Sequence, residues 1–148
     1  RVEVFCFGTR LTRITRSLER RRPDEALDDA ARSVFDWEGG TRIGHAVETF
    51  VKRWGRRGMS RGAIVVICSD GLERGDPEEL ADQMRRLKRL AHRVVWVNPL
   101  KGNPEYQPLA GGMRAALPFV DRFLPGHNLR SLEELATVLA GIERRHAA

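Results

Sequence analysis

Cysteine is scarce in this chain, because Cys6 and Cys68 are the only two and each stands within an apolar run. They lack CxxC spacing, so they provide neither a cysteine-type zinc site nor a disulfide framework. Free cysteine in such a run behaves as a small buried hydrophobic residue. This usage fits a reducing, cytoplasmic setting.

Long hydrophobic runs are also missing, and none approaches the ~20 residues that a membrane-spanning helix needs. The chain begins at Arg1, and the run Val2–Phe7 follows at once as a predicted strand with no signal peptide before it. We therefore expect residues 1–148 to be one domain that is N-terminally truncated, part of a longer chain.

Lysine is rare among the 26 basic residues: Lys52, Lys88 and Lys101 are the only lysines, and the net charge is +6. Arginines are densest between Arg10 and Arg22. This stretch would suit an acidic partner or a nucleic-acid backbone, or it is simply a solvated face. We favour the solvated face, because no pattern of a nucleic-acid-binding module accompanies the charge.

Motifs of common enzymes are absent as well. Neither GxxxxGK[ST] nor GxSxG occurs, so the chain does not resemble an ATPase or a serine hydrolase. His92, His127 and His146 have no metal-ligand spacing. His45 comes one turn after Thr41 and could line a site there, although an exposed helical position is the simpler interpretation.

Apolar periodicity predicts strands that alternate with helices. Strands are expected at 2–7, 11–15, 63–68, 94–97 and 119–123, and helices are expected to begin near Pro23, Thr41, Pro77, Met113 and Ser131. The run Ala63–Cys68 is typical of a central parallel strand covered on both faces. This alternation predicts an α/β fold with a mostly parallel sheet and helices on both faces.

Two polar residues stand where such a fold binds ligands, beyond the carboxyl ends of its strands. Asp70 follows the strand at 63–68, and Thr41 opens a helix. Read singly, Thr41 is a helix cap and Asp70 a turn residue. Together they offer hard oxygens from two loops, which Mg²⁺ prefers.

Six segments stand in a characteristic order along the chain: Val2–Leu11, Trp37–Gly44, Val66–Gly71, Trp96–Leu100, Gly112–Pro118 and Asp121–Leu132. Their combination resembles the von Willebrand factor A (VWA) domain of CoxE-like proteins. The resemblance implies a three-layer Rossmann-like fold with sheet order 3-2-1-4-5-6 and one antiparallel edge strand. It also implies a metal-ion-dependent adhesion site (MIDAS) for Mg²⁺, with Mn²⁺ and Ca²⁺ as alternatives, in which Thr41 ligates directly and Asp70 acts through water.

The family's first metal motif, Asp-x-Ser-x-Ser, is absent from these residues. Its strand belongs between the predicted strands 2–7 and 63–68, so we expect a gap in mid-sheet or a non-native closure of that gap, and weak metal binding by these residues alone. Apolar surface beside such a gap predicts low stability, which melting and solubility measurements would test. A cooperative, soluble monomer would contradict this expectation.

The resemblance implies a protein-binding module that is not an enzyme. A partner carboxylate would complete the metal shell, and a MoxR-type AAA+ ATPase is the expected partner in maturing metalloenzymes of the carbon monoxide dehydrogenase type. No nucleic acid is expected as a partner. Two rivals stay open: a hydrolase- or phosphatase-like enzyme that uses Asp70, and a nucleic-acid binder that uses the stretch Arg10–Arg22.

Overall fold

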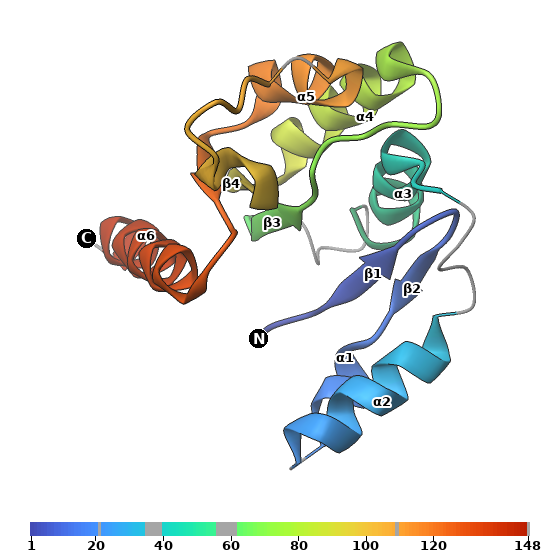
Figure 1. Ribbon diagram of the computed structural model, residues 1–148, viewed down its shortest axis with the longest axis vertical. Helices are drawn as coiled ribbons and strands as arrows, with labels where there is room; N and C mark the ends of the chain where they lie inside the picture. The colour runs from blue at the N-terminus through green and yellow to red at the C-terminus, as the bar shows by residue number, and fades with distance from the viewer. Residues whose placement is uncertain (21, 35–39, 56–61, 109, 148) are drawn as a thin grey trace.

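The computed structural model describes residues 1–20, 22–34, 40–55, 62–108 and 110–147. Strands and helices alternate along most of this length (Figure 1). The elements are β1 (Phe5–Phe7), β2 (Leu11–Arg13), α1 (Thr15–Leu18), α2 (Pro23–Ser33), α3 (Ile43–Phe50) with a π-helical turn (Val51–Gly55), β3 (Ile64–Cys68), α4 (Pro77–Leu90), β4 (Arg93–Asn98) with a 3-10 turn (Pro99–Gly102), α5 (Gly111–Ala116) with a 3-10 turn (Leu117–Phe119), β5 (Arg122–Pro125) and α6 (Leu129–Ala147).

The main sheet has three parallel strands in the order β3-β4-β5. Its middle strand, β4, is buried throughout Val94–Asn98, as its run of apolar residues favours. The strands β1 and β2 form a separate antiparallel pair in which Phe5 lies opposite Arg13 and residues 8–10 make the turn. A parallel sheet with covering helices and an antiparallel pair confirms the α/β, Rossmann-like fold class.

The core lies between the sheet and the helices α3, α4 and α5. Trp96 of β4 is completely buried there. Its neighbours in the core include the fully buried side chains of Ile43, Leu80, Met84 and Met113. The apolar spacing that predicted these helices therefore marks the faces that pack on the sheet.

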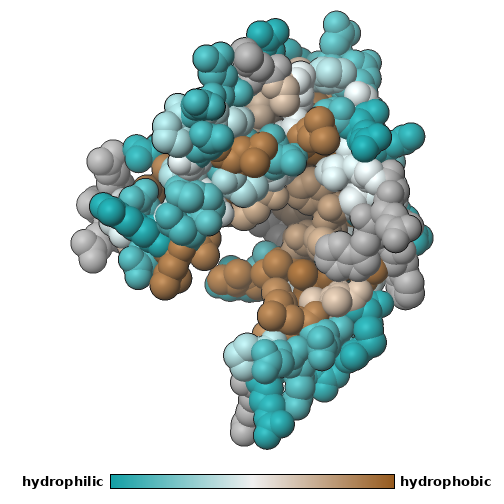
Figure 2. Space-filling model, viewed as in Figure 1, coloured by the Kyte–Doolittle hydropathy of each residue, from teal (hydrophilic) through white to brown (hydrophobic). Residues whose placement is uncertain are grey.

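The two sheets do not pair with each other in the described structure, and a cavity of about 1280 Å³ lies between them. Side chains of β1 and β3 line its two sides, including Phe5, Phe7, Ile64 and Val66. Figure 2 shows hydrophobic side chains on both sides of this hollow. The gap expected in mid-sheet is thus present, and it exposes the apolar surface from which low stability is predicted.

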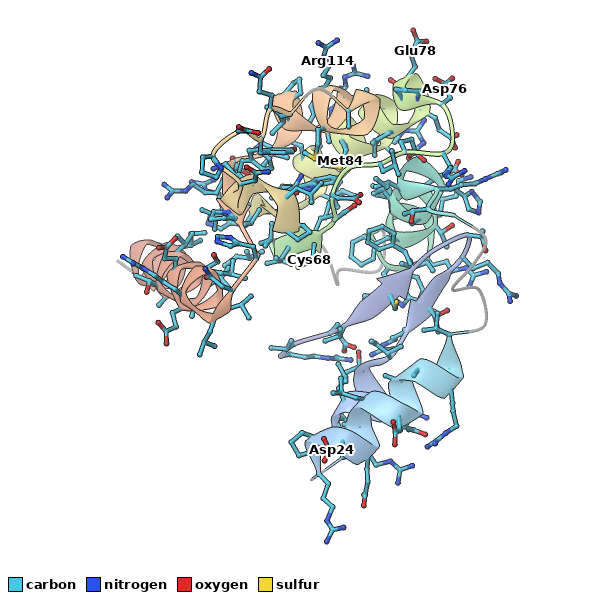
Figure 3. The ribbon with its side chains drawn as sticks, viewed as in Figure 1. Asp24, Cys68, Asp76, Glu78, Met84 and Arg114 are labelled. Atoms are coloured by element: carbon cyan, nitrogen blue, oxygen red, sulfur yellow. The ribbon has the colours of Figure 1, made fainter. Side chains whose placement is uncertain are left out.

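The gap corrects one expectation about β3. This strand is an edge strand of the described sheet and not a central one, because it pairs only with β4 and its other edge faces the cavity. Only Ile67 is buried in it, and Cys68, which we expected to be buried, is exposed at its end (Figure 3). Cys6 in β1 is half-buried.

Several element boundaries also differ from expectation. The short helix α1 replaces the end of the second predicted strand. The helix α6 begins before Ser131, because Asn128 Oδ1 accepts a hydrogen bond from Ser131 N at 2.9 Å and takes the capping role. Two leucines in helices are exposed, Leu27 in α2 and Leu132 in α6, although the apolar periodicity of these helices favours a buried position for both. Residues 37–39 of the matching segment Trp37–Gly44 lie outside the described residues.

The N-terminal segment is tied to the β1–β2 pair by Glu3. Its carboxylate accepts hydrogen bonds from Arg13 Nη2 at 2.6 Å, Thr15 Oγ1 at 2.8 Å and Arg1 Nε at 2.8 Å. The bonds from Arg13 and Thr15, more than the one from Arg1, lower the pKa of Glu3 to about 2 from 4.5. The ionised carboxylate is therefore the form that stabilises the fold.

We expect the contribution of Glu3 to stability to depend on pH. It should be fully present above pH 4.5 and should be lost as the pH falls toward 2, because the folded-state pKa is the lower one. Urea unfolding of the wild type and Glu3→Gln across this range measures the difference in free energy of unfolding. A difference that stays constant with pH would contradict the ion pair.

Candidate metal centre

A pocket of about 290 Å³ opens at the carboxyl end of β3, beside β1. The residues that line it are Phe5, Cys6, Phe7, Thr41, Cys68, Ser69 and Asp70. Thr41 precedes α3 and Asp70 follows β3, so the fold brings both predicted site residues to one place. This is the edge of a parallel sheet at which α/β proteins bind ligands.

The neighbouring strand β4 holds the loop that carries Asp70. Ser69 N donates to Val97 O at 3.0 Å, and Trp96 Nε1 donates to Ser69 O at 2.9 Å. The completely buried Asn98 donates from Nδ2 to Asp70 O at 3.2 Å and to Tyr106 Oη at 2.9 Å. These bonds fix the backbone on both sides of the exposed Asp70 side chain.

The Asp70 carboxylate makes the turn contact that its local sequence predicts. Its Oδ1 accepts a hydrogen bond from Leu72 N at 2.9 Å, and Gly71 between them has φ +78°. No described residue donates a hydrogen bond to Oδ2 of Asp70. The turn uses one oxygen of the carboxylate, so a second role for Asp70 is compatible with it.

Thr41 does not cap α3, which corrects the simpler interpretation of this residue. The capping position is Arg42, and its side chain makes no capping hydrogen bond. The Thr41 carbonyl accepts a hydrogen bond from Arg74 N at 2.9 Å, which joins it to the loop after Asp70. Its hydroxyl is therefore not used to begin the helix.

The cap of α3 comes from Glu73, a residue that sequence reasoning missed. Its carboxylate accepts from Ile43 N at 3.1 Å and from Gly44 N at 2.7 Å, while Gly75 N donates to it from its own loop at 2.9 Å. A carboxylate at a helix N-terminus is also favoured by the helix dipole. Glu73 thus joins the Thr41 loop to the Asp70 loop.

The oxygen ligands that Thr41 and Asp70 offer to the pocket are of the type that a hard divalent cation prefers. Thr41 carries a neutral hydroxyl and Asp70 a carboxylate, and oxygen ligands of these types suit Mg²⁺. The Ser69 hydroxyl already accepts a hydrogen bond from Gly71 N at 3.1 Å. Two protein oxygens leave most of an octahedral shell to water or to other groups.

His45 does not line this pocket. It lies on the exposed side of α3, where its Nδ1 is 3.8 Å from Glu48 Oε2. Among the described residues that line the pocket there is no lysine and no histidine. His45 therefore belongs to a different surface.

Arginines of the stretch Arg10–Arg22 are partly neutralised by acidic neighbours. Arg13 pairs with Glu3 at 2.6 Å, Arg20 Nε lies 3.7 Å from Asp29 Oδ2, and Arg22 Nη1 lies 3.4 Å from Glu25 Oε1. Arg21 lies outside the described residues. The pairs offset part of the positive charge of this stretch.

A search of the described residues for a helix with the length and apolar character to cross a membrane found no candidate.

Comparison with known proteins identifies the family. The family model for "VWA domain containing CoxE-like protein" matches residues 1–132. No curated protein and no solved structure matches the chain. The match covers most of the 148 residues and agrees with the parallel sheet and the segments that suggested the resemblance. The chain belongs to the family of VWA domain-containing CoxE-like proteins.

Proposed function

We propose that this domain is a protein-binding module, not an enzyme, and that its adhesion-type site depends on Mg²⁺ or on Mn²⁺ or Ca²⁺ in its place. The observation that carries the proposal is the shared pocket of Thr41 and Asp70 at the carboxyl end of β3. These residues come from two separate loops, as expected of a cation site in an α/β sheet.

Each residue has a definite part in the proposal. Thr41 offers its hydroxyl and Asp70 its carboxylate. Glu73 and Asn98 hold the two loops in position through their hydrogen bonds to Gly44 N and Asp70 O. A bound Mg²⁺ would supply an electrophilic position that an acidic side chain of a partner protein can occupy. Metal and partner should therefore bind cooperatively, since each adds ligands that the other needs.

The partner that we propose is a MoxR-type AAA+ ATPase, with the VWA domain as a cytoplasmic adaptor in the maturation of metalloenzymes of the carbon monoxide dehydrogenase type. Membership of the CoxE-like family supports this assignment. The net charge of +6 also favours association with an acidic protein surface.

Substitution of the two proposed metal ligands, Thr41 and Asp70, tests the proposal. In the full-length protein, Thr41→Ala and Asp70→Asn should each weaken Mg²⁺-dependent binding to the MoxR-type ATPase at least about tenfold, because even the loss of an outer-shell partner costs about 10–100-fold at metal sites. Binding is measured by interferometry with Mg²⁺ and with a chelator. Thr49→Ala is the matched control, because its hydroxyl bonds only to the His45 carbonyl within α3.

The rivals predict different outcomes of the same experiment. Partner binding that ignores the chelator and both variants would overturn the metal-dependent mechanism. Phosphatase activity that disappears in Asp70→Asn would favour the enzyme. Binding to nucleic acid that falls steeply with salt and ignores metal would favour the basic stretch Arg10–Arg22.

A further inference from the structure

We infer that the surface between α3 and α4 holds a second divalent-cation site, of the mixed nitrogen and oxygen type that Zn²⁺ prefers. Its ligands are His45 and Glu48 on α3 and Glu79 on α4, whose ligand atoms all lie within 4.8 Å of one another. Neither Thr41 nor Asp70 belongs to this group, so the inference goes beyond the proposed adhesion-type site.

The close packing of α3 on α4 explains why these residues meet (Figure 1). A Cβ atom on Gly44 would lie only 3.0 Å from Leu80 N and 3.1 Å from Leu80 Cα, so the two helix backbones are in direct contact here. His45 follows Gly44 and Glu79 precedes Leu80. The contact therefore places these two side chains together where the helices reach the surface.

Glu48 completes the group because it lies three residues after His45, on the same face of α3. Its Oε2 is 3.8 Å from His45 Nδ1. Ligand atoms around tetrahedral Zn²⁺ are about 3.3 Å apart, given bonds of about 2.0–2.1 Å. Small side-chain rotations would thus close the site on a cation.

The scaffold below the three side chains is fixed. Ile43 and Leu80, which flank the contact, are completely buried, and Gly44 N is held by Glu73 at 2.7 Å. Ligands on two packed helices are positioned more accurately than ligands on loops. The side chains of His45 and Glu79 are themselves exposed, so a cation can reach them from solvent.

The donor types select the metal. One imidazole nitrogen and two carboxylates form a three-ligand set that leaves a position for water or for a further ligand, as in open zinc sites. Mg²⁺ prefers oxygen ligands only and retains several waters. Lys52 Nζ lies 2.6 Å from Glu48 Oε1 and lowers the pKa of Glu48, which keeps the carboxylate ionised but competes with a cation for it.

Titration of the full-length protein with ZnCl₂ tests the inference. After treatment with a chelator and dialysis, calorimetry should show one Zn²⁺ site, and Co²⁺ should give the visible absorption of a low-coordinate centre. His45→Ala and Glu79→Gln should each weaken the binding of Zn²⁺ at least tenfold. Lys52→Gln should tighten it, because Glu48 then loses its competing ion pair.

Matched controls separate this site from others. His127→Ala and Glu78→Gln replace an exposed histidine and an exposed acid outside the group, and should leave Zn²⁺ affinity unchanged. Thr41→Ala should also leave it unchanged, so failure of the adhesion-type site would not affect this result. Absence of stoichiometric Zn²⁺ binding, or binding that survives both His45→Ala and Glu79→Gln, would overturn the inference.

Discussion

Gly112→Ala is expected to lower the free energy of unfolding by about 3 kcal/mol, the upper range for overpacking a well-filled interior. A Cβ at this position would lie 2.1 Å from the Gly71 carbonyl oxygen and 3.0 Å from Glu73 Cβ. The first neighbour is backbone, so the clash can be relieved only if α5 or the Asp70 loop moves. Thermal melting should show a decrease on the order of 10 °C.

Gly111→Ala in the same helix is the control for Gly112→Ala. Its Cβ would meet only Pro77 Cγ, at 3.5 Å, which is an ordinary van der Waals contact. Alanine also favours the helix over glycine, so this variant should be unchanged or slightly more stable. If Gly112→Ala melts like the wild type, α5 does not pack on the loop as described.

Gly112→Ala should also affect the candidate metal centre. Gly71 follows Asp70 directly, and movement of its carbonyl would displace the carboxylate from the pocket that it shares with Thr41. We therefore expect Gly112→Ala to weaken Mg²⁺-dependent binding as well as stability, whereas Gly111→Ala should weaken neither.

Glu73→Ala is expected to destabilise the fold by about 2–6 kcal/mol. Removal of the carboxylate leaves the N–H groups of Ile43 and Gly44, two buried residues, without their acceptors, and each such group costs about 1–3 kcal/mol. Glu73→Gln should show a smaller loss, because its amide retains one accepting oxygen. Urea unfolding measures the free energy of unfolding of the wild type, Glu73→Ala and Glu73→Gln.

Glu78→Ala provides the comparison for Glu73→Ala. Glu78 is exposed in the first turn of α4, where its charge is favoured by the helix dipole, so its loss should cost less than about 1 kcal/mol (Figure 3). Equal stabilities of the Glu73 and Glu78 variants would show that the cap of α3 is not important to the fold.

Much of the fold could be predicted from local patterns. The periodicity of Ile43 and Val47 predicted the buried face of α3, and Asp76 followed by Pro77 predicted the start of α4, where Asp76 Oδ1 accepts from Glu78 N at 2.9 Å. The position of Asp70 beyond the carboxyl end of β3 predicted a ligand-binding edge of the sheet, and the order of motifs along the chain, which resembles the CoxE-like VWA family, placed Thr41 at the same site.

Other features could not be predicted from local patterns. Nothing around Glu73 marks it as the cap of α3, since the helix that it caps lies far earlier in the chain. Asn98 looks like a simple strand end, yet it holds the Asp70 loop. His45 and Glu79 meet only because Gly44 lets α3 approach α4 closely.

The sequence by itself determined the α/β class, the family, and the loops that carry Thr41 and Asp70, because these follow from periodicity, turn chemistry and motif order along the chain. Only the tertiary structure decided that Glu73 joins those loops, that β3 has an open edge beside a cavity, and that α3 and α4 bring three metal-ligating side chains together. The reason is physical: each of these depends on contacts between residues distant in sequence, which packing sets and local pattern does not.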